Sequence, residues 1–134
     1  MESKIGLISI ITSRFEELLI FYRDVLGFKV KLKLDGYVEF ENLGVRFALS
    51  THKVMADATK HDSFSQNRRG QSFELAFPVS TPSDVDKTYD DILKKGAIPI
   101  KSPKDMPWNQ RAAFFADPDG NIHEIFADLS SAGS

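Results

Sequence analysis

Apolar residues along the chain alternate between strand-like and helix-like spacing. Lys4–Thr12 is rich in β-branched and apolar side chains, which is typical of a buried strand. Ser13 and Glu16 have the spacing of a capping box at the start of a helix, and Gly27 is placed to end that helix. Between them one apolar face recurs at helical spacing, formed by Phe15, Leu18, Leu19, Tyr22, Val25 and Leu26.

Three further strands complete the first half of the chain. We expect them at Phe28–Leu34, Tyr37–Glu41 and Val45–Ser50. Asp35-Gly36 lies between the first two, and an Asp-Gly pair between alternating runs predicts a hairpin because both turn residues need positive φ. The order β-α-β-β-β is therefore predicted over about residues 4–50.

The second half has the same order of elements. A strand is predicted at Ser72–Val79, followed by a helix with Thr81 as its cap, Pro82 in its first turn and Gly96 at its end. Three more strands are then expected at Ile98–Lys101, Arg111–Ala116 and Asn121–Ala127. Module 2 therefore covers about residues 72–128.

The two predicted helices share their apolar pattern at a single offset. Val85 follows Leu18 by 67 positions (85 − 18 = 67), and the same offset relates Tyr22 to Tyr89, Val25 to Ile92 and Leu26 to Leu93. Such a match, with a strand before each helix, indicates an internal repeat. We expect a single domain over residues 1–134, built from two similar modules.

Residues 51–71 join the two modules and are mostly polar. A structureless loop of this length is uncommon, so we expect the segment to be functional, mobile or partly helical. It could act as a lid or as a dimer contact. The small polar tail from Ser130 is expected to be frayed.

Composition excludes several classes of function. A formal net charge of −2 gives no reason to expect nucleic acid or an anionic membrane as a partner. The chain has no cysteine, which excludes disulfides, thiolate metal ligands and a cysteine nucleophile. No signal peptide or membrane span is apparent, so a cytoplasmic protein is expected.

Two segments resemble the signature segments of the vicinal oxygen chelate superfamily: Phe21–Phe28 (FYRDVLGF) and Asp117–Glu124 (DPDGNIHE). That group includes glyoxalase I, extradiol dioxygenases, fosfomycin-resistance enzymes and bleomycin-resistance proteins. The resemblance implies an α+β fold, in which two tandem βαβββ modules form an open, barrel-like mixed sheet with helices outside. It also implies a small-molecule cleft and a homodimer.

The resemblance further implies four cleft positions that hold a divalent metal in the superfamily's enzymes, and these fall at Leu7, Ala48, Glu74 and Glu124. Leu7 and Ala48 have no ligating atom, and Glu74 stands where histidine is usual. Two carboxylates alone could hold a hard cation only weakly, with several waters. We therefore expect either no cofactor or a weakly held Mn²⁺, Mg²⁺, Zn²⁺ or Ni²⁺, with Glu74 and Glu124 as ligands if a metal binds.

Strand parity places Glu74 on the face opposite Phe73 and Leu75, and so in the cleft. The resemblance places Glu124 there too. Two acids facing one cleft repel, so at least one should have a raised pKa, as suits general acid–base catalysis or a cationic ligand. An arginine could instead neutralise either acid.

The remaining candidates are ligand-binding residues. Arg46 shares strand parity with Ala48 and could enter the cleft, and Arg111 lies on a strand of the second half. Trp108 precedes that strand in a loop, where it could stack on a flat ligand or anchor the loop in the core. Leu7 and Ala48 complete the predicted cleft lining.

Two functions follow from these residues. The first is binding of a small molecule without the superfamily's usual metal site, as in bleomycin-resistance proteins. The alternative is a glyoxalase-type lyase or isomerase, which would be metal-dependent or would work by acid–base catalysis with Glu124 and Glu74.

Overall fold

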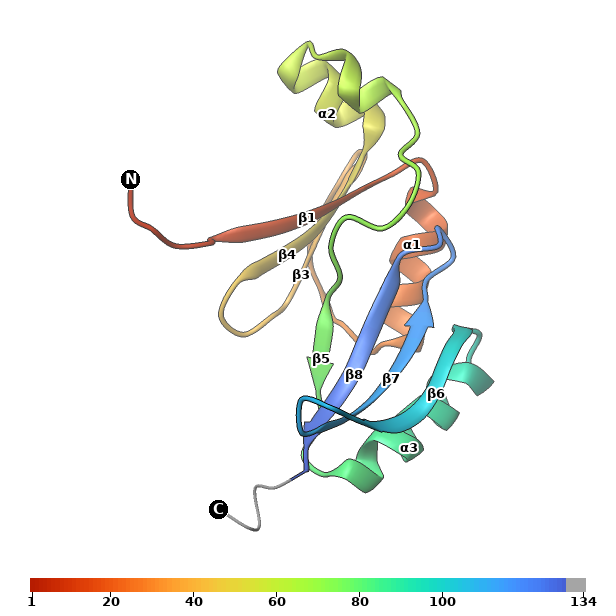
Figure 1. Cartoon of the computed structure of the whole chain (residues 1–134). Coiled ribbons are helices and arrows are strands. Elements are labelled where there is room, and N and C mark those ends of the chain that lie inside the picture. The colour runs from red at the N-terminus through yellow and green to blue at the C-terminus, as the bar shows by residue number, and fades with distance from the viewer. Residues whose placement is uncertain (130–134) are drawn as a thin grey trace. The chain divides into compact units, whose positions relative to one another are not determined.

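The structure is a computed structural model and describes residues 1–129, which form two compact units (Figure 1). The N-terminal unit ends at Arg69 and the C-terminal unit begins at Gly70. Each unit contains a four-stranded mixed sheet, and the two sheets have equivalent strand orders, β1-β4-β3-β2 and β5-β8-β7-β6. The predicted α+β class and the two βαβββ modules are confirmed.

In the N-terminal unit the first and last strands are parallel neighbours. The four strands are β1 (Leu7–Thr12), β2 (Val30–Leu34), β3 (Tyr37–Phe40) and β4 (Arg46–Thr51). β1 pairs with β4 in parallel, whereas β2–β3 and β3–β4 are antiparallel. α1 (Phe15–Ile20) follows β1 and continues into one π-helical segment, η1 (Phe21–Val25).

An aromatic cluster forms the core between this helix and its sheet. Tyr22 is fully buried, and its ring centroid lies 5.4 Å from that of Phe47, 6.1 Å from Phe40 and 6.4 Å from Phe28. Edge-to-face and tilted contacts of this kind add to the free energy gained by burying the rings. The core therefore lies on the face of the sheet that carries Phe40 and Phe47.

The predicted capping box at Ser13 and Glu16 is wrong. α1 begins at Phe15, its N-cap position is Arg14, and no side chain caps it. Instead, the buried Thr12 accepts a hydrogen bond from the Arg14 backbone N–H at 2.8 Å, so the last residue of β1 fixes the entry to the helix. At the other end Gly27 has φ of +84°, as its predicted terminating role requires.

The segment 51–71 is partly helical, as one of the expectations had it. It contains α2 (His52–Thr59) and the 3₁₀ helix η2 (Asp62–Ser65). Thr51 caps α2 by accepting a hydrogen bond from Val54 N–H at 3.0 Å. A Cβ on Gly36 would lie only 2.7 Å from the Val54 side chain, so a glycine in the β2–β3 turn lets α2 approach the hairpin.

The C-terminal unit repeats this arrangement with β5 (Ala76–Pro78), α3 (Pro82–Lys94), β6 (Ile98–Met106), β7 (Gln110–Ala116) and β8 (Ile122–Asp128). β5 pairs with β8 in parallel, and the other two pairs are antiparallel. The predicted cap is confirmed, because Thr81 forms a capping box with Asp84. The buried helix residues Val85, Tyr89 and Ile92 form the face predicted from the repeat.

Two strand lengths in this unit differ from the prediction. β6 continues to Met106 rather than ending at Lys101, because an edge strand tolerates its prolines where register shifts interrupt the ladder with β7. β5 covers only Ala76–Pro78 of the predicted Ser72–Val79, because side chains rather than a strand ladder hold the preceding residues. The expected fraying from Ser130 lies outside the described residues. No helix among residues 1–129 is long and apolar enough to cross a bilayer.

Candidate functional site: a carboxylate pair in the C-terminal unit

Glu124 lies near the middle of β8, on the face of the sheet that does not carry the aromatic core. The register pairs it with Ala76 of β5 and Phe114 of β7. Its neighbour His123 points to the other face, where its ring contacts those of Phe77 and Phe115 at 5.8 and 5.9 Å. Glu124 and His123 therefore project from opposite faces of the sheet.

Glu124 is almost completely buried, with 7% of its surface exposed, and the charged group that acts on it is the Glu74 carboxylate. Burial, a hydrogen bond between the two carboxyl groups and their mutual repulsion together raise the pKa of Glu124 to about 7. Glu74 itself is exposed. The structure thus brings together the two acids predicted from the sequence, and one of them, Glu124, titrates near neutral pH.

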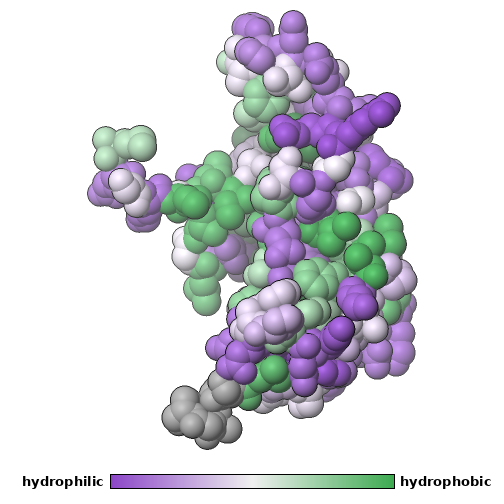
Figure 2. All heavy atoms as spheres, in the orientation of Figure 1, coloured by the Kyte–Doolittle hydropathy of each residue, from purple (hydrophilic) through white to green (hydrophobic). Residues whose placement is uncertain are grey.

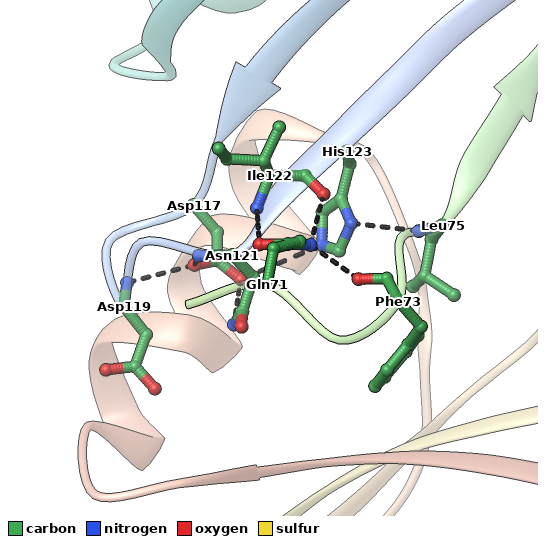
Figure 3. Close-up of polar contacts among 8 residues, drawn as sticks. All are labelled: Gln71, Phe73, Leu75, Asp117, Asp119, Asn121, Ile122 and His123. Atoms are coloured by element: carbon green, nitrogen blue, oxygen red, sulfur yellow. Dashed lines mark hydrogen bonds and ion pairs between the residues drawn. The ribbon is translucent and has the colours of Figure 1, made fainter. Parts of the chain in front are cut away.

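Glu74 is positioned by backbone contacts of its neighbour Leu75 (Figure 3). The Leu75 N–H donates to His123 Nδ1 at 3.1 Å, and the Leu75 carbonyl accepts from Glu124 N–H at 2.9 Å. The Gln71 side chain donates to the carbonyls of Phe73 and Ile122 and accepts from Ile122 N–H. These contacts replace the missing part of the β5 ladder and hold residues 71–75 against β8.

His123 is neutral in this arrangement. An N–H donor at Nδ1 requires an unprotonated nitrogen there, so the ring proton is on Nε2, which lies 3.9 Å from Asp117 Oδ2. Burial lowers the pKa of His123, against the opposite influence of the Asp117 and Glu74 carboxylates. His123 is a packed core residue, since 2% of its surface is exposed.

Asp117 fixes the turn that leads into β8. Its carboxylate is fully buried and accepts hydrogen bonds from Asp119 N–H, Asn121 N–H and Asn121 Nδ2, all at 2.9–3.0 Å (Figure 3). This is the reason for the DPDGN sequence at the start of the second signature segment. The residues around Glu124 therefore begin their strand from a rigid turn.

Arg46 lies in the N-terminal unit and is paired with Glu39, a residue that the sequence analysis did not single out. The guanidinium donates from Nε to Glu39 Oε2 at 3.0 Å and from Nη2 to Glu39 Oε1 at 2.6 Å. Tyr37 OH donates to the same carboxylate at 3.2 Å. The Arg46 guanidinium, followed by Tyr37 and Lys31, holds the pKa of Glu39 below its usual range despite burial.

Arg111 is on the opposite face of its sheet from Glu124, by the register of β7 with β8. Its guanidinium forms two 2.8 Å hydrogen bonds with Asp86 of α3 and one of 2.9 Å with Asp105 of β6. Other carboxylates therefore occupy both guanidinium groups, and the charged group that acts on Glu124 is the Glu74 carboxylate. A direct role of either arginine in ligand binding stays a prediction.

The other predicted lining residues lie in different environments. Trp108 is 56% exposed in the turn between β6 and β7, so it does not anchor the loop in the core. Leu7 is 42% exposed at the start of β1, whereas Ala48 is fully buried in β4. Their ligand-binding roles stay predictions.

The residues present do not fit the superfamily's usual metal site. Two of its four implied positions carry Leu7 and Ala48, whose side chains contain no donor atom. Throughout residues 1–129, no three His, Asp or Glu side chains form a group that could hold a metal ion. A structural or catalytic transition metal usually has three or four protein ligands, and Glu74 and Glu124 supply too few for one.

A model of the Glyoxalase/Bleomycin resistance protein/Dioxygenase superfamily matches residues 4–125. The chain belongs to this superfamily. It is 34% identical over 126 residues to an uncharacterized protein, YraH, of Bacillus subtilis (strain 168), covering 91% of this chain and 96% of that protein. The resemblance drawn from the two signature segments is thus confirmed.

Solved structures of the superfamily share the fold. A glyoxalase/bleomycin resistance protein/dioxygenase from Nocardioides has 27% identity and a TM-score of 0.86, covering 98% of this chain and 87% of that one. A family enzyme from Burkholderia phytofirmans PsJN has 23% identity and a TM-score of 0.85, covering 95% and 100%. A lactoylglutathione lyase from Agrobacterium tumefaciens has 22% identity and a TM-score of 0.66, covering 95% of each chain.

Proposed function

We propose that this chain binds a small organic molecule on the Glu124 face of its C-terminal sheet, without the superfamily's usual metal site. The observation that carries the proposal is the nearly buried Glu124 beside a second carboxylate, Glu74. Burying one acid beside another costs free energy, so the pair does not serve the stability of the fold. A ligand with a cationic or hydrogen-bonding group would compensate that cost.

The surroundings of Glu124 suit a ligand with an apolar body. Its register neighbours are Ala76 and Phe114, and Phe126 lies two residues further along the same face. An apolar surface with a few convergent polar groups is the usual composition of a small-molecule site. We therefore expect ligands that combine an amine or amide with an aliphatic or aromatic part.

A fragment screen by protein-observed NMR tests this proposal. Amine- and amide-bearing fragments should shift the backbone amides of Glu124 and Phe114, and Glu124→Gln should weaken the best fragment about tenfold. Asp90→Asn is the matched control, since Asp90 is exposed on α3 and the substitution removes the same charge. Equal weakening by both substitutions, or fragments that all bind elsewhere, would contradict the proposal.

The proposed absence of the usual metal site has its own test. Calorimetric titration of the whole chain with Mn²⁺, Zn²⁺ and Ni²⁺ should give only weak binding that Glu74→Gln weakens further. A tight one-to-one site, with ligand binding that is lost on chelation, would instead support the metal-dependent alternative.

One observation favours a second candidate, acid–base catalysis of the glyoxalase type by a lyase or isomerase. With a pKa of about 7, Glu124 is about half protonated near neutral pH and can both donate and accept a proton. Exchange of a carbonyl compound's α-proton for deuterium, followed by NMR across a panel of small α-hydroxy ketones, would detect such catalysis. Glu124→Gln should abolish the exchange, and Asp90→Asn should leave it unchanged.

We also propose a cytoplasmic homodimer. The edge strand β2 exposes the apolar side chains of Val30, Leu32 and Leu34, which are 37%, 45% and 56% exposed, and a second copy could cover them. Light scattering on the eluting peak of a size-exclusion column should give a dimer mass. Replacing Leu32 and Leu34 with lysine should give the monomer if this edge is the interface.

A further inference from the structure

The N-terminal unit exposes a rigidly held arginine that the proposed function does not use. Glu39 is the residue that orients it, because both carboxylate oxygens accept from the same guanidinium. The Glu39 side chain is 3% exposed, whereas the Arg46 side chain is 61% exposed. A buried acid thus fixes the plane of an exposed cation, which lowers the entropy that Arg46 would lose on binding a further anion.

Arg46 lies at one end of an open groove of about 830 Å³. The groove is lined by the residues before β1 and by the turn before β4: Lys4, Ile5, Gly6, Leu7, Gly44, Val45 and Arg46. The two segments are joined by a hydrogen bond from Arg46 N–H to the Gly6 carbonyl at 3.1 Å. A Cβ built on Gly6 or Gly44 would meet no atom within 4 Å, so both lining glycines border open space.

The groove combines positively charged and apolar side chains. Its two charged lining residues, Lys4 and Arg46, are both cations. Its apolar walls include Ile5 and Leu7, which are 72% and 42% exposed. Figure 2 shows this hydrophobic surface at the start of β1, next to the β3–β4 turn where Leu43 is 98% exposed. A ligand that matched this surface would be anionic at one end and apolar over the rest.

We propose that this groove is a second binding site, which takes a small monocarboxylate with an aliphatic or aromatic body. The carboxylate would hydrogen-bond to the outer edge of the Arg46 guanidinium, and the apolar body would cover Ile5 and Leu7. A dianion is less suitable, because the Glu39 carboxylate lies directly behind the guanidinium and repels the second charge. The site uses neither Glu74 nor Glu124, and it assigns a ligand class to Arg46 and Leu7, two residues already predicted to line the cleft.

Octanoate is a suitable probe, and 1-octanol is its uncharged match. Titrated into the ¹⁵N-labelled full chain, octanoate should shift the amides of Gly6, Gly44 and Arg46, and octanol should bind at least tenfold more weakly. Arg46→Lys keeps the charge but loses the planar fork, so it should raise the dissociation constant for octanoate about tenfold. Its unfolding midpoint, measured alongside, reports whether the Glu39 pair still supports the fold.

Lys4→Gln keeps the test decisive if Arg46→Lys fails to fold, because the exposed Lys4 supports no buried group. It should raise the dissociation constant for octanoate about threefold. Lys53→Gln is the matched control, since Lys53 is 83% exposed on α2 and pairs there with Asp57. Equal effects of the two substitutions, or octanol binding as tightly as octanoate, would overturn the proposal.

The position of the shifts separates this site from the proposed function. If octanoate shifted only amides around Glu124 and Phe114, the groove would not be a carboxylate site, and the proposed function would stand. If octanoate shifted Gly6 and Gly44 while no fragment reached Glu124, the groove would be a carboxylate site and the proposed function would be contradicted.

Discussion

Each unit buries one carboxylate on the sheet face opposite its aromatic core, and the two carboxylates have opposite surroundings. Glu39 in β3 is bound by Arg46, Tyr37 and Lys31, and these partners keep its pKa low. Glu124 in β8 has a second acid as its neighbour, and its pKa rises to about 7. Burial is similar for the two, since 2% of Glu39 and 7% of Glu124 is exposed. Burial raises the pKa of both acids, and the Arg46 guanidinium beside Glu39 outweighs that effect in the N-terminal unit.

Because of the internal repeat, the two units can be compared residue by residue. The register pairs Ser9 with Ala48 in one unit and Ala76 with Glu124 in the other, so Ala48 and Glu124 are equivalent. Counting back along the two strands, Phe47 corresponds to His123, and Arg46 to Ile122. Arg46 of the N-terminal unit is therefore replaced by Ile122 in the C-terminal unit, and Phe47 is replaced by His123.

The largest effect is expected for His123→Ala. This substitution removes a buried ring from between Phe77 and Phe115 and leaves the Leu75 N–H without its acceptor. The free energy of unfolding, measured with urea, should fall by about 3 kcal/mol. His123→Phe, the residue of the other unit, restores the packing alone and should lose about 1 kcal/mol. Equal losses would mean that the packing of the ring contributes nothing and that the Leu75 hydrogen bond accounts for the whole effect.

Ile122→Arg introduces into the C-terminal unit the cation that the N-terminal unit has at Arg46. Residues 122 and 124 project from the same face of β8, so the guanidinium can reach Glu124. We expect the pKa of Glu124 to fall by about two units, as measured by ¹³C NMR of its carboxyl carbon. Ile122→Met has similar length without charge and should leave the pKa near 7; a fall of the same size there would exclude charge as the cause.

Glu124→Gln should remove one part of the pH dependence of stability. Between its ordinary 4.5 and about 7 the folded chain retains the Glu124 proton, whereas the unfolded chain has lost it. Stability therefore falls as the pH rises through this window, and the variant should be more stable at pH 8 by about 1–2 kcal/mol. A variant that unfolds with the same pH profile as the natural sequence would place the Glu124 pKa near its ordinary value.

His123 has the opposite effect on how stability changes with pH. Because its pKa is lowered in the folded state, the unfolded chain binds a proton first as the pH falls below 6.5, and stability is lost toward acid. His123→Phe should remove this acid-side loss and leave the Glu124 slope in place. Thermal unfolding midpoints of the two variants from pH 4 to pH 8 separate the two contributions.

The order of the elements followed from local signals and the fold class from the family resemblance. The raised pKa of one acid in the Glu74–Glu124 pair was also predicted, whereas the carboxylates that pair with Arg46 and Arg111 were not. The Asp35-Gly36 turn and the Thr81 cap are short-range patterns, and the common offset compares the local patterns of two helices; each predicted an element that the structure has. Parity and the resemblance together predicted the Glu74–Glu124 pair. The partners of Arg46 and Arg111 lie 6 to 25 positions away on other elements, and no local pattern distinguishes those carboxylates from solvent-exposed ones.

His123 and Gln71 show a second limit of the sequence. Residues 72–75 alternate like a strand, yet an imidazole and an amide take the place of the ladder. Side-chain hydrogen bonds over 48 and 51 positions depend on the register of β5 with β8, which alternation alone does not specify. The available signal was His123, a polar residue on the core face of β8. It indicated a packed side chain but did not indicate its hydrogen-bond partner.

The smallest effect is expected for Glu74→Gln. The repulsion between the two carboxylates disappears, but Glu124 keeps its burial, which is the largest cause of its raised pKa. The pKa of Glu124 should therefore fall by no more than about one unit and stay above 4.5. In the His123→Phe background, residues 71–75 have lost one of their attachments to β8, so Glu74 is held less firmly beside Glu124. Glu74→Gln should therefore lower the pKa of Glu124 even less. If Glu74→Gln instead returned the Glu124 pKa fully to its ordinary value, the raised pKa would come from the Glu74 carboxylate alone. Glu124 and Glu39 would then differ only in the charge of the neighbouring side chain.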